Sequence, residues 1–380
     1  MTIFSFATAQ EIRFGRGCAE QEIAVVSRYG SKVFVVHGAN ADRSDWLVNR
    51  LNDQSLTVQR FKCASEPDVD IIEAGVNAAR AHGAQVVISL GGGAVIDAGK
   101  AIAALVPAQR PMMDHLEVVG RGLALEDDPL PFIAIPTTAG TGAEVTKNSV
   151  ISVAEHRRKV SLRDVRMLPD LALVDPALTD DTPRGITLAS GLDAVTQVIE
   201  PYLSNKANRL TDALCRDAIL QGMQALVRLM RHEDSAARDD MAWVSLCGGL
   251  ALANSGLGAV HGLAGVIGGL CGAPHGAICG ALLPHVLQAN AAQADMDART
   301  AARIAEVQGW IATGLKVAVP DAFGALAEWS RAQGLPRLAD MGLSRQDHEA
   351  VAMSSVASSS MKGNPVPLSV AELQVILNAS

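Results

Sequence analysis

Three consecutive glycines, Gly91, Gly92 and Gly93, stand where a phosphate group could bind. They follow a β-branched run at 85–90 and precede a helical pattern at 96–105. Glycine lets the backbone approach an anion closely, and the beginning of a helix offers free N–H groups and the positive end of its dipole. The spacing differs from the GxGxxG dinucleotide fingerprint. Taken alone, the run is also consistent with a tight turn that binds no ligand.

A second polar loop, residues 136–144, follows another expected strand and combines hydroxyl groups with glycines. It reads PTTAGTGAE, with Thr137, Thr138 and Thr141 as the hydroxyl-bearing residues. An ordinary strand-to-helix connection whose threonines cap the next helix would give the same pattern. Two such loops after strands of one sheet favour a nucleotide site, because open α/β sheets bind ligands at the carboxyl ends of their strands.

The elements that must position these loops alternate along the first half of the chain. β-Branched runs at 32–37, 85–90, 131–136 and 171–174 predict strands, and the runs at 41–54, 71–82 and 96–105 predict helices. This alternation indicates an α/β fold with a parallel sheet and crossover helices. From about residue 190 apolar positions recur every three or four residues, which predicts helix after helix. We expect an α/β dinucleotide-binding domain at 1–180, an all-helical metal or substrate domain at 181–380, and a site in the cleft between them.

Composition and charge narrow the class of protein. A chain of 380 residues exceeds the roughly 250–300 residues at which single cores stop growing, so two domains are expected. The net charge of -8 argues against nucleic-acid binding, which needs a basic surface to displace counterions. The six cysteines show no CxxC spacing and no secretory leader follows Met1, so we expect a cytoplasmic protein with reduced thiols.

The most apolar stretch, residues 248–287, is rich in glycine and is interrupted by prolines and histidines. A membrane span needs about 20 apolar residues without such interruptions. We therefore expect buried helices here and no membrane insertion.

The two polar loops resemble those of a known family, the iron-containing alcohol dehydrogenases, whose typical motifs are GGGS-x-x-D-x-x-K and PTTxGTGSEVT. This chain reads GGGAVIDAGK at 91–100 and PTTAGTGAEVT at 136–146. Further matches occur at residues 14–15, 159, 175–179, 191–194, 260–262 and 274–276, so that the resemblance covers the chain to about residue 290. It implies the dehydroquinate synthase-like fold of that family.

The resemblance implies an NAD(P)-dependent oxidoreductase that transfers hydride between nicotinamide and a small alcohol, aldehyde or ketone, and a homodimer as in many members. It assigns Lys159, near the nicotinamide end, and Asp193 as catalytic residues. Without the resemblance, Lys159 would be interpreted as one exposed charge in a basic run. The implied cofactor contacts are Gly38, Gly91, Gly92, Gly93, Asp97, Thr137, Thr138, Thr141, Asn148, Lys159 and Leu178.

Gly38 bears on the choice between NAD and NADP. NAD-preferring members of the family typically carry an acidic residue near this position, where it binds the ribose hydroxyls. Glycine removes the repulsion against a 2′-phosphate, and Arg43 could supply its positive partner, although a surface arginine at a helix start has the same appearance. The sequence leans toward NADP.

The family's iron site implies a metal centre in the helical half. It uses an aspartate, a histidine four residues later and two further histidines about fourteen apart, which match Asp193, His261 and His275. Gln197 occupies the remaining position, and its neutral carbonyl is a poor ligand for Fe(II). Three ligands still suffice for a zinc site of the kind found in the related glycerol dehydrogenases. The metal is therefore iron or zinc, unless these residues are only hydrogen-bonded core groups.

A second departure from the family is Gly265, four residues after His261, where alcohol dehydrogenases often carry a histidine close to the substrate. Glycine cannot transfer protons, so another group must do so. Three alternatives stay open: a metal-independent reductase of the maleylacetate reductase type, a lyase of the dehydroquinate synthase type, and a nucleotide-binding paralogue with weakened catalysis. Cys271 and Cys279 lie near His275 in the sequence and could be soft metal ligands, but thiols with glycine-rich apolar neighbours are usually inert core residues, and we interpret them so.

Overall fold

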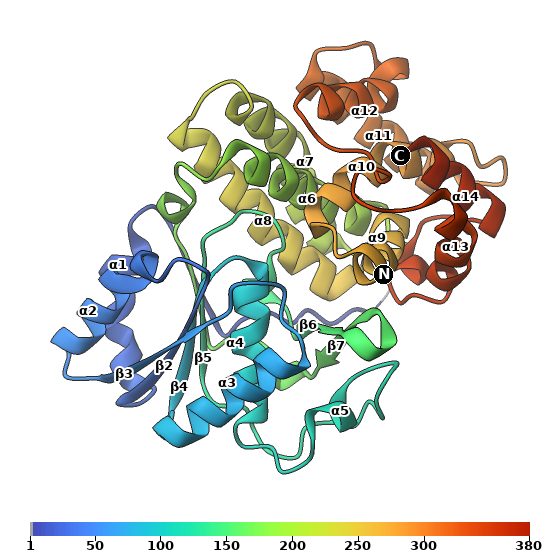
Figure 1. Cartoon of the computed structure of the whole chain (residues 1–380). Coiled ribbons are helices and arrows are strands. Elements are labelled where there is room, and N and C mark those ends of the chain that lie inside the picture. Colours follow the sequence, from blue (N-terminus) through green and yellow to red (C-terminus); the bar gives the residue numbers. More distant parts are fainter. Residues whose placement is uncertain (1–2) are drawn as a thin grey trace. The chain divides into compact units, whose positions relative to one another are not determined.

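A parallel sheet organises the first half of the chain in the computed structural model, which describes residues 3–380 (Figure 1). Within those residues it has six strands in the order β1-β8-β5-β4-β2-β3, and every neighbouring pair is parallel. The strands are β1 (Glu11–Phe14), β2 (Lys32–His37), β3 (Thr57–Lys62), β4 (Val86–Gly91), β5 (Phe132–Pro136) and β8 (Leu171–Val174). The expected α/β fold with a parallel sheet is confirmed.

Helices cover both faces of this sheet. The helices α3 (Val69–His82) and α4 (Gly93–Leu105) pack on one face, where they enclose Phe34 of β2 and Val87 of β4. The helices α1 (Cys18–Glu22) and α2 (Asp45–Asp53) pack on the other face, against the alternate side chains of the same strands (Figure 1). Burial on both faces explains why β2, β4, β5 and β8 read as continuous apolar runs.

The direction of chain winding reverses between β2 and β4. From β2 the chain moves outward to the edge strand β3, and it returns to pair β4 with the other side of β2, with His37 opposite Leu90. The carboxyl ends of these two strands therefore place Gly38 beside Gly91, Gly92 and Gly93, which we call the glycine turn. Ligands of open α/β sheets bind at such a reversal.

Several short elements were not predicted from the sequence. The edge strand β3, TVQRFK, is largely half-buried and lacks a continuous apolar run, and β1 is a short, mostly half-exposed edge strand. The hairpin of β6 (Asn148–Val153) and β7 (Arg158–Arg163) lies outside the main sheet. The helix predicted at 41–54 is a 3-10 turn, Ala41–Ser44, followed by α2, because the Asn40 side chain accepts from Asp42 N–H and begins the turn first.

Helices make up the second half, as the 3.6-residue period predicted. Their buried faces form one large apolar core, and α6 is buried over most of its length. The helices are α6 (Arg184–Leu203), α7 (Arg209–Leu229), α8 (Ser235–Ser255), α9 (Ala259–Cys271), α10 (His275–Ala291), α11 (Ala298–Leu315), α12 (Ala322–Ala332), α13 (His348–Val356) and α14 (Val370–Ala379). One further short helix, α5 (Met112–His115), belongs to the first half.

The chain divides into two compact units whose borders follow the change of period near residue 180. The α/β unit contains residues 8–138 and 143–179, and the helical unit contains 180–380 together with 3–7 and 139–142. The sequence assigned these last two segments to the first domain. They belong to the helical unit because Ala7 and Asn254 exchange hydrogen bonds, and because Gly140 N–H donates to Ser245 Oγ.

The apolar stretch at 248–287 forms parts of α8, α9 and α10 in the core of the helical unit. Among residues 3–380, no single helix is long and apolar enough to cross a membrane, although α8 and α9, bent by 98° at their junction, reach that length and composition together.

Candidate metal centre and nucleotide site

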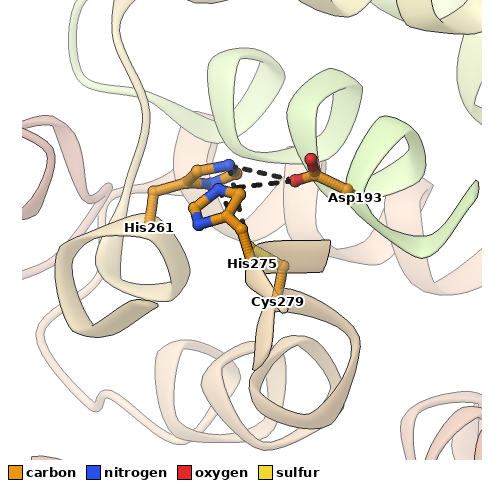
Figure 2. Close-up of side chains that lie close together, drawn as sticks. All are labelled: Asp193, His261, His275 and Cys279. Atoms are coloured by element: carbon orange, nitrogen blue, oxygen red, sulfur yellow. Dashed lines mark hydrogen bonds and ion pairs between the residues drawn. The ribbon is translucent and has the colours of Figure 1, made fainter. Parts of the chain in front are cut away.

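Four side chains from three helices converge inside the helical unit. They are Asp193 of α6, His261 of α9, and His275 and Cys279 of α10, and one ligand atom from each lies within 4.8 Å of the others. Figure 2 shows the carboxylate and the two imidazole rings turned toward one another, with Cys279 one helical turn from His275. The structure thus brings together the three metal ligands predicted from the sequence and adds a thiol.

Two glycines allow α10 to approach α6 closely enough to form this cluster. A β-carbon on Gly276 would lie 2.4 Å from the Ala189 carbonyl oxygen, and one on Gly280 would lie 2.6 Å from Leu192 Cδ1. Each glycine follows a cluster residue directly, so the residues that permit the close packing alternate with those that point at Asp193. A larger side chain at either position would push α10 away from α6.

The distances within the cluster fit a metal ion. Asp193 Oδ1 lies 3.3 Å from His261 Nε2 and 3.9 Å from His275 Nε2. Asp193 is only 2% exposed, and within the described residues Oδ1 accepts no hydrogen bond that meets ordinary geometry. A buried carboxylate oxygen without such a bond is costly unless a cation satisfies it. The donor set of one carboxylate and two imidazoles suits zinc or iron.

Glu200 orients the first imidazole. His261 Nδ1 donates to Glu200 Oε2 at 2.7 Å, while Val260 N–H donates to Glu200 Oε1 at 2.6 Å. Because a carboxylate can only accept, the proton of a neutral imidazole stays on Nδ1 and leaves the Nε2 lone pair toward Asp193 and His275. A carboxylate behind a metal-bound histidine is a common second partner that fixes the ring and its tautomer.

The electrostatics of the cluster favour positive charge. Burial alone would lower the pKa of His275, but Cys279 and Asp193 raise it to about 9. The pKa of His261 is also raised despite its burial, through Cys279, Asp193 and Glu200. Burial would raise the pKa of Asp193, yet His275 and His261 lower it. Protons on the two imidazoles therefore balance the acidic groups in the same way that a bound cation would.

Gln197, the weaker predicted ligand, lies on α6 one turn after Asp193. Its Nε2 donates to the Gly140 carbonyl at 2.9 Å, and its buried Oε1 accepts no hydrogen bond within residues 3–380. The close packing of Gly248, whose β-carbon would lie 3.0 Å from Gln197 Cβ, holds the residue in place. Its role as a ligand stays a prediction.

Gly265 lies one turn after His261 on the same face of α9. A β-carbon built there meets no heavy atom of the described residues within 4 Å. The position that often carries a histidine in the family is therefore open space here.

Six of the predicted nucleotide contacts lie at the carboxyl ends of β2, β4 and β5, namely Gly38, Gly91, Gly92, Gly93, Thr137 and Thr138. Gly91 pairs with Pro136, Thr137 N–H donates to the Gly91 carbonyl at 3.0 Å, and a β-carbon on Gly92 would lie 3.2 Å from Thr138 Oγ1. Gly92 is the residue before α4, and within residues 3–380 no side chain caps this helix. The glycine turn thus presents an uncapped helix start at the reversal of the sheet, as a phosphate site requires.

Some residues of the glycine motif also have packing roles. A β-carbon on Gly91 would lie 2.6 Å from the Val95 side chain, and one on Gly99 would lie 1.9 Å from Ser89 Oγ. These glycines let α4 pack directly on β4. Asp97 Oδ2 accepts from Val150 N–H at 3.1 Å, so that one predicted cofactor contact also fixes β6.

The buried Lys100 binds the end of the second polar loop, residues 136–144, which we call the threonine loop. Its buried Nζ lies 2.8–2.9 Å from the carbonyl oxygens of Ala143, Thr146 and Asn148 and from Thr146 Oγ1. Lys100 therefore connects the motif at 91–100 with residues 143–148, which include the end of the second motif. Asn148, a predicted cofactor contact, serves in this network through its backbone oxygen.

The remaining predicted contacts occupy different surroundings. Lys159 lies on β7 with its Nζ 3.5 Å from Glu66 Oε2, and Leu178 packs against the core beneath the α1 face. Thr141 belongs to the segment that joins the helical unit. Gly38 has room for a β-carbon, since within 4 Å it would meet no heavy atom of residues 3–380 except Val95 Cγ2, at 3.8 Å. Arg43 is exposed.

Comparison with known proteins identifies the family. The model described as iron-containing alcohol dehydrogenase matches residues 9–176, and that of the C-terminal part of the Fe-containing alcohol dehydrogenase family matches residues 187–380. The chain belongs to the iron-containing alcohol dehydrogenase family. Membership confirms the resemblance, the fold and the expected enzyme class, an NAD(P)-dependent alcohol dehydrogenase or aldehyde reductase. It favours an oxidoreductase over the lyase alternative.

Relatives in this family match most or all of the chain. The NAD-dependent methanol dehydrogenase of Bacillus methanolicus is 31% identical over 392 residues, covering 100% of both chains. The lactaldehyde reductase of Escherichia coli (strain K12) is 34% identical over 303 residues, covering 79% of this chain and 78% of its own.

Solved structures agree. A 1,3-propanediol oxidoreductase superimposes with a TM-score of 0.89 at 27% identity, covering 99% of each chain. The sulfoacetaldehyde reductase of Bifidobacterium kashiwanohense, in complex with NAD+, gives a TM-score of 0.84 at 25% identity, covering 100% of this chain and 98% of the other.

Sequence reasoning assigned no site role to Glu200 or Lys100, and it set Cys279 aside as a core residue after weighing it as a soft metal ligand. Glu200 and Lys100 each bond to residues far along the chain, which no local pattern reveals. Cys279 follows His275 by four residues, the spacing that places two side chains on one helix face, and that signal was present in the sequence.

Proposed function

We propose that this chain interconverts a small alcohol and its aldehyde or ketone, using NADP(H) at least as readily as NAD(H), with a divalent metal bound by Asp193, His261 and His275. The observation that carries the proposal is the convergence of these three side chains around a carboxylate oxygen that lacks a regular hydrogen bond. When bound, the metal supplies Lewis acidity to the substrate oxygen, and the nicotinamide ring supplies or takes up the hydride.

Residues of the chain position the metal ligands and bind the nucleotide. Glu200 holds the tautomer of His261, as its 2.7 Å bond supports, and the two glycines of α10 keep His275 against Asp193. The glycine turn and Thr137 and Thr138 bind the dinucleotide phosphates and ribose. Lys159 remains a predicted contact of the nicotinamide end.

The lean toward NADP rests on Gly38. The open surroundings of this residue and the absence of a carboxylate there leave room for a 2′-phosphate, and the exposed Arg43 is near enough in sequence to pair with it. A relative of this chain is described as NAD-dependent, which is opposite to this lean. The decisive measurement is therefore a comparison of kcat/KM with NADPH and with NADH.

Proton transfer needs a group other than residue 265. With glycine at that position, the proton of the alcohol passes to solvent, to a ribose hydroxyl or to another side chain. A catalytically weakened paralogue is the second candidate, and the open space at Gly265 is the observation that favours it.

We further propose that the protein is a cytoplasmic homodimer that binds neither nucleic acid nor membrane. The apolar N-terminal run supports self-association, since Ile3 is 98% exposed and Phe4 is 43% exposed in the single chain. Light scattering coupled to size exclusion measures the oligomeric state directly.

The proposed function is tested with purified protein. Metal content is measured, and the absorbance of NADH and NADPH is followed with a panel of small aldehydes and ketones. We expect oxidation of nucleotide that Asp193→Ala and His275→Ala abolish together with metal binding. His285→Ala, a histidine of the same helix outside the cluster, is the matched control and retains both.

Two results would count against the proposal. Nucleotide binding without turnover on any carbonyl compound supports the weakened paralogue instead. Full activity in the metal-free Asp193→Ala variant supports a metal-independent reductase.

A further inference from the structure

A buried thiol lies beside the three predicted metal ligands, whereas residue 197, a histidine ligand in the family, is glutamine here. Cys279 Sγ lies 3.6 Å from His275 Nε2 and 3.9 Å from His261 Nε2, and it belongs to the same group of mutually close atoms as Asp193 Oδ1. Figure 2 shows Cys279 beside His275 on the same helix, on the side that faces the cluster. The side chain is buried.

The separations between these atoms match a tetrahedral shell. Ligands about 2.0–2.3 Å from a zinc ion in tetrahedral geometry lie roughly 3.3–3.8 Å from one another. The four contacts that join carboxylate or thiol to imidazole span 3.3–3.9 Å. Small movements of the side chains would therefore let all four atoms bind one ion, and the substrate oxygen of the proposed reaction would bind by expansion of the shell to five ligands.

We propose that Cys279 is the fourth protein ligand of the metal, so that the site is Asp193, His261, His275 and Cys279 and prefers zinc to Fe(II). The inference rests on the proposed metal site. The second observation that points to a ligand is Asp193 Oδ1, a buried oxygen without a regular hydrogen bond that faces the same point. Thiolate is a soft ligand that selects zinc, whereas the oxygen of Gln197 is neutral and hard.

Helix geometry explains how the substitution works. Asp193 and Gln197 lie one turn apart on α6, and His275 and Cys279 lie one turn apart on α10. In the family, the helix that corresponds to α6 supplies two ligands and the helix that corresponds to α10 supplies one. In this chain α6 would supply only Asp193, and α10 would supply both His275 and Cys279. Binding requires the thiolate, so the thiol proton is released to solvent when the metal enters.

Cobalt(II) provides a test that does not depend on activity. Co²⁺ occupies zinc sites and gives an intense thiolate-to-cobalt charge-transfer absorption in the near ultraviolet only when sulfur is bound. The metal is removed from the full-length protein, Co²⁺ is added, and stoichiometry and spectrum are recorded. We expect one ion for each chain, with the thiolate band present.

Three variants assign the band. Cys279→Ser should lose it and raise the zinc dissociation constant at least about tenfold. Cys271→Ser, the same change in a cysteine outside the cluster, and Gln197→Ala should keep it. Thermal unfolding of each variant shows that it is folded.

The outcomes separate this inference from the proposed function. If Co²⁺ binds to the unmodified protein without a thiolate band, or if the band persists in Cys279→Ser, Cys279 is not a ligand, and aldehyde reduction by the same preparation leaves the proposed function intact. If neither Co²⁺ nor Zn²⁺ binds, both the thiol ligand and the metal site are wrong. If the band is lost in Gln197→Ala but kept in Cys279→Ser, the fourth ligand position depends on α6 and not on Cys279 of α10, and the inference is wrong.

Discussion

His261 Nδ1 lies 2.7 Å from Glu200 Oε2, so a carboxylate that is not itself in the ligand cluster determines which nitrogen of His261 can bind a metal. Glu200 is buried, and its other oxygen accepts from Val260 N–H at the start of α9. One residue of α6 thereby fixes both the ring and the helix that carries it.

Glu200→Gln should weaken metal binding about 10–100-fold, because the amide nitrogen would face Nδ1 as a donor and favour the tautomer with its proton on Nε2. Competition with a chromophoric chelator measures the dissociation constant. Glu306→Gln, the same change on α11 outside the cluster, serves as control. Equal affinities in both variants would show that Glu200 does not position His261.

The sequence predicted those parts of the fold that local composition determines. The strands β2 and β8 have the predicted bounds, because strands buried on both faces are continuous β-branched runs. The edge strand β3 mixes polar and apolar residues, so its pairing with β2 could only be recognised once the neighbouring strand was in place.

The candidate sites divide in the same way. Asp193, His261 and His275 carry a motif, and the structure brings them together as expected. The spacing of Cys279 from His275 is visible in the sequence, but the close approach of α10 to α6 that Gly276 and Gly280 allow is a packing relation that a single sequence does not reveal. The network of Lys100 likewise depends on how α4 lies against the threonine loop.

Gly265→His should be tolerated and should restore a titrating group near the metal cluster. A β-carbon has open space there, and replacing glycine within α9 should stabilise the helix by a few tenths of a kcal/mol. If the imidazole assists proton transfer, the pH profile of kcat gains an ionisation near the ordinary histidine value of about 6.5.

The matched variant is Gly265→Phe, which fills the same space without a titrating group. A pH profile that changes equally in both variants would attribute the effect to packing instead of proton transfer.

Gly38→Asp should shift the cofactor preference toward NAD. The carboxylate would repel a 2′-phosphate and could accept from the ribose hydroxyls, and a β-carbon at this position meets no heavy atom of the described residues within 4 Å other than Val95 Cγ2, at 3.8 Å. We expect kcat/KM with NADPH to fall by about tenfold or more while that with NADH is maintained or rises. Gly38→Asn, which adds similar bulk without charge, is the control, and equal losses in the two variants would contradict the electrostatic explanation.

Glu144 should make stability depend on pH in the neutral range. Burial raises the pKa of Glu144 to about 7 from 4.5, although Lys100 acts in the opposite direction. Between these two values the folded state binds the proton more tightly than the unfolded state does. The free energy of unfolding therefore contains a contribution that is complete below about pH 4.5 and is lost as the pH rises to about 7, on the order of 3 kcal/mol.

Glu144→Gln removes this titration, so the difference in unfolding free energy between pH 5 and pH 8 should become smaller than in the unmodified protein. Urea unfolding at both pH values measures it, with Glu73→Gln, an exposed residue of α3, as the control that leaves the difference unchanged. An unchanged pH dependence in Glu144→Gln would mean that Glu144 stays ionised in the fold, held by the neighbouring Lys100 ammonium. In that case the buried pair, and not a neutral carboxyl group, supports the threonine loop from beneath.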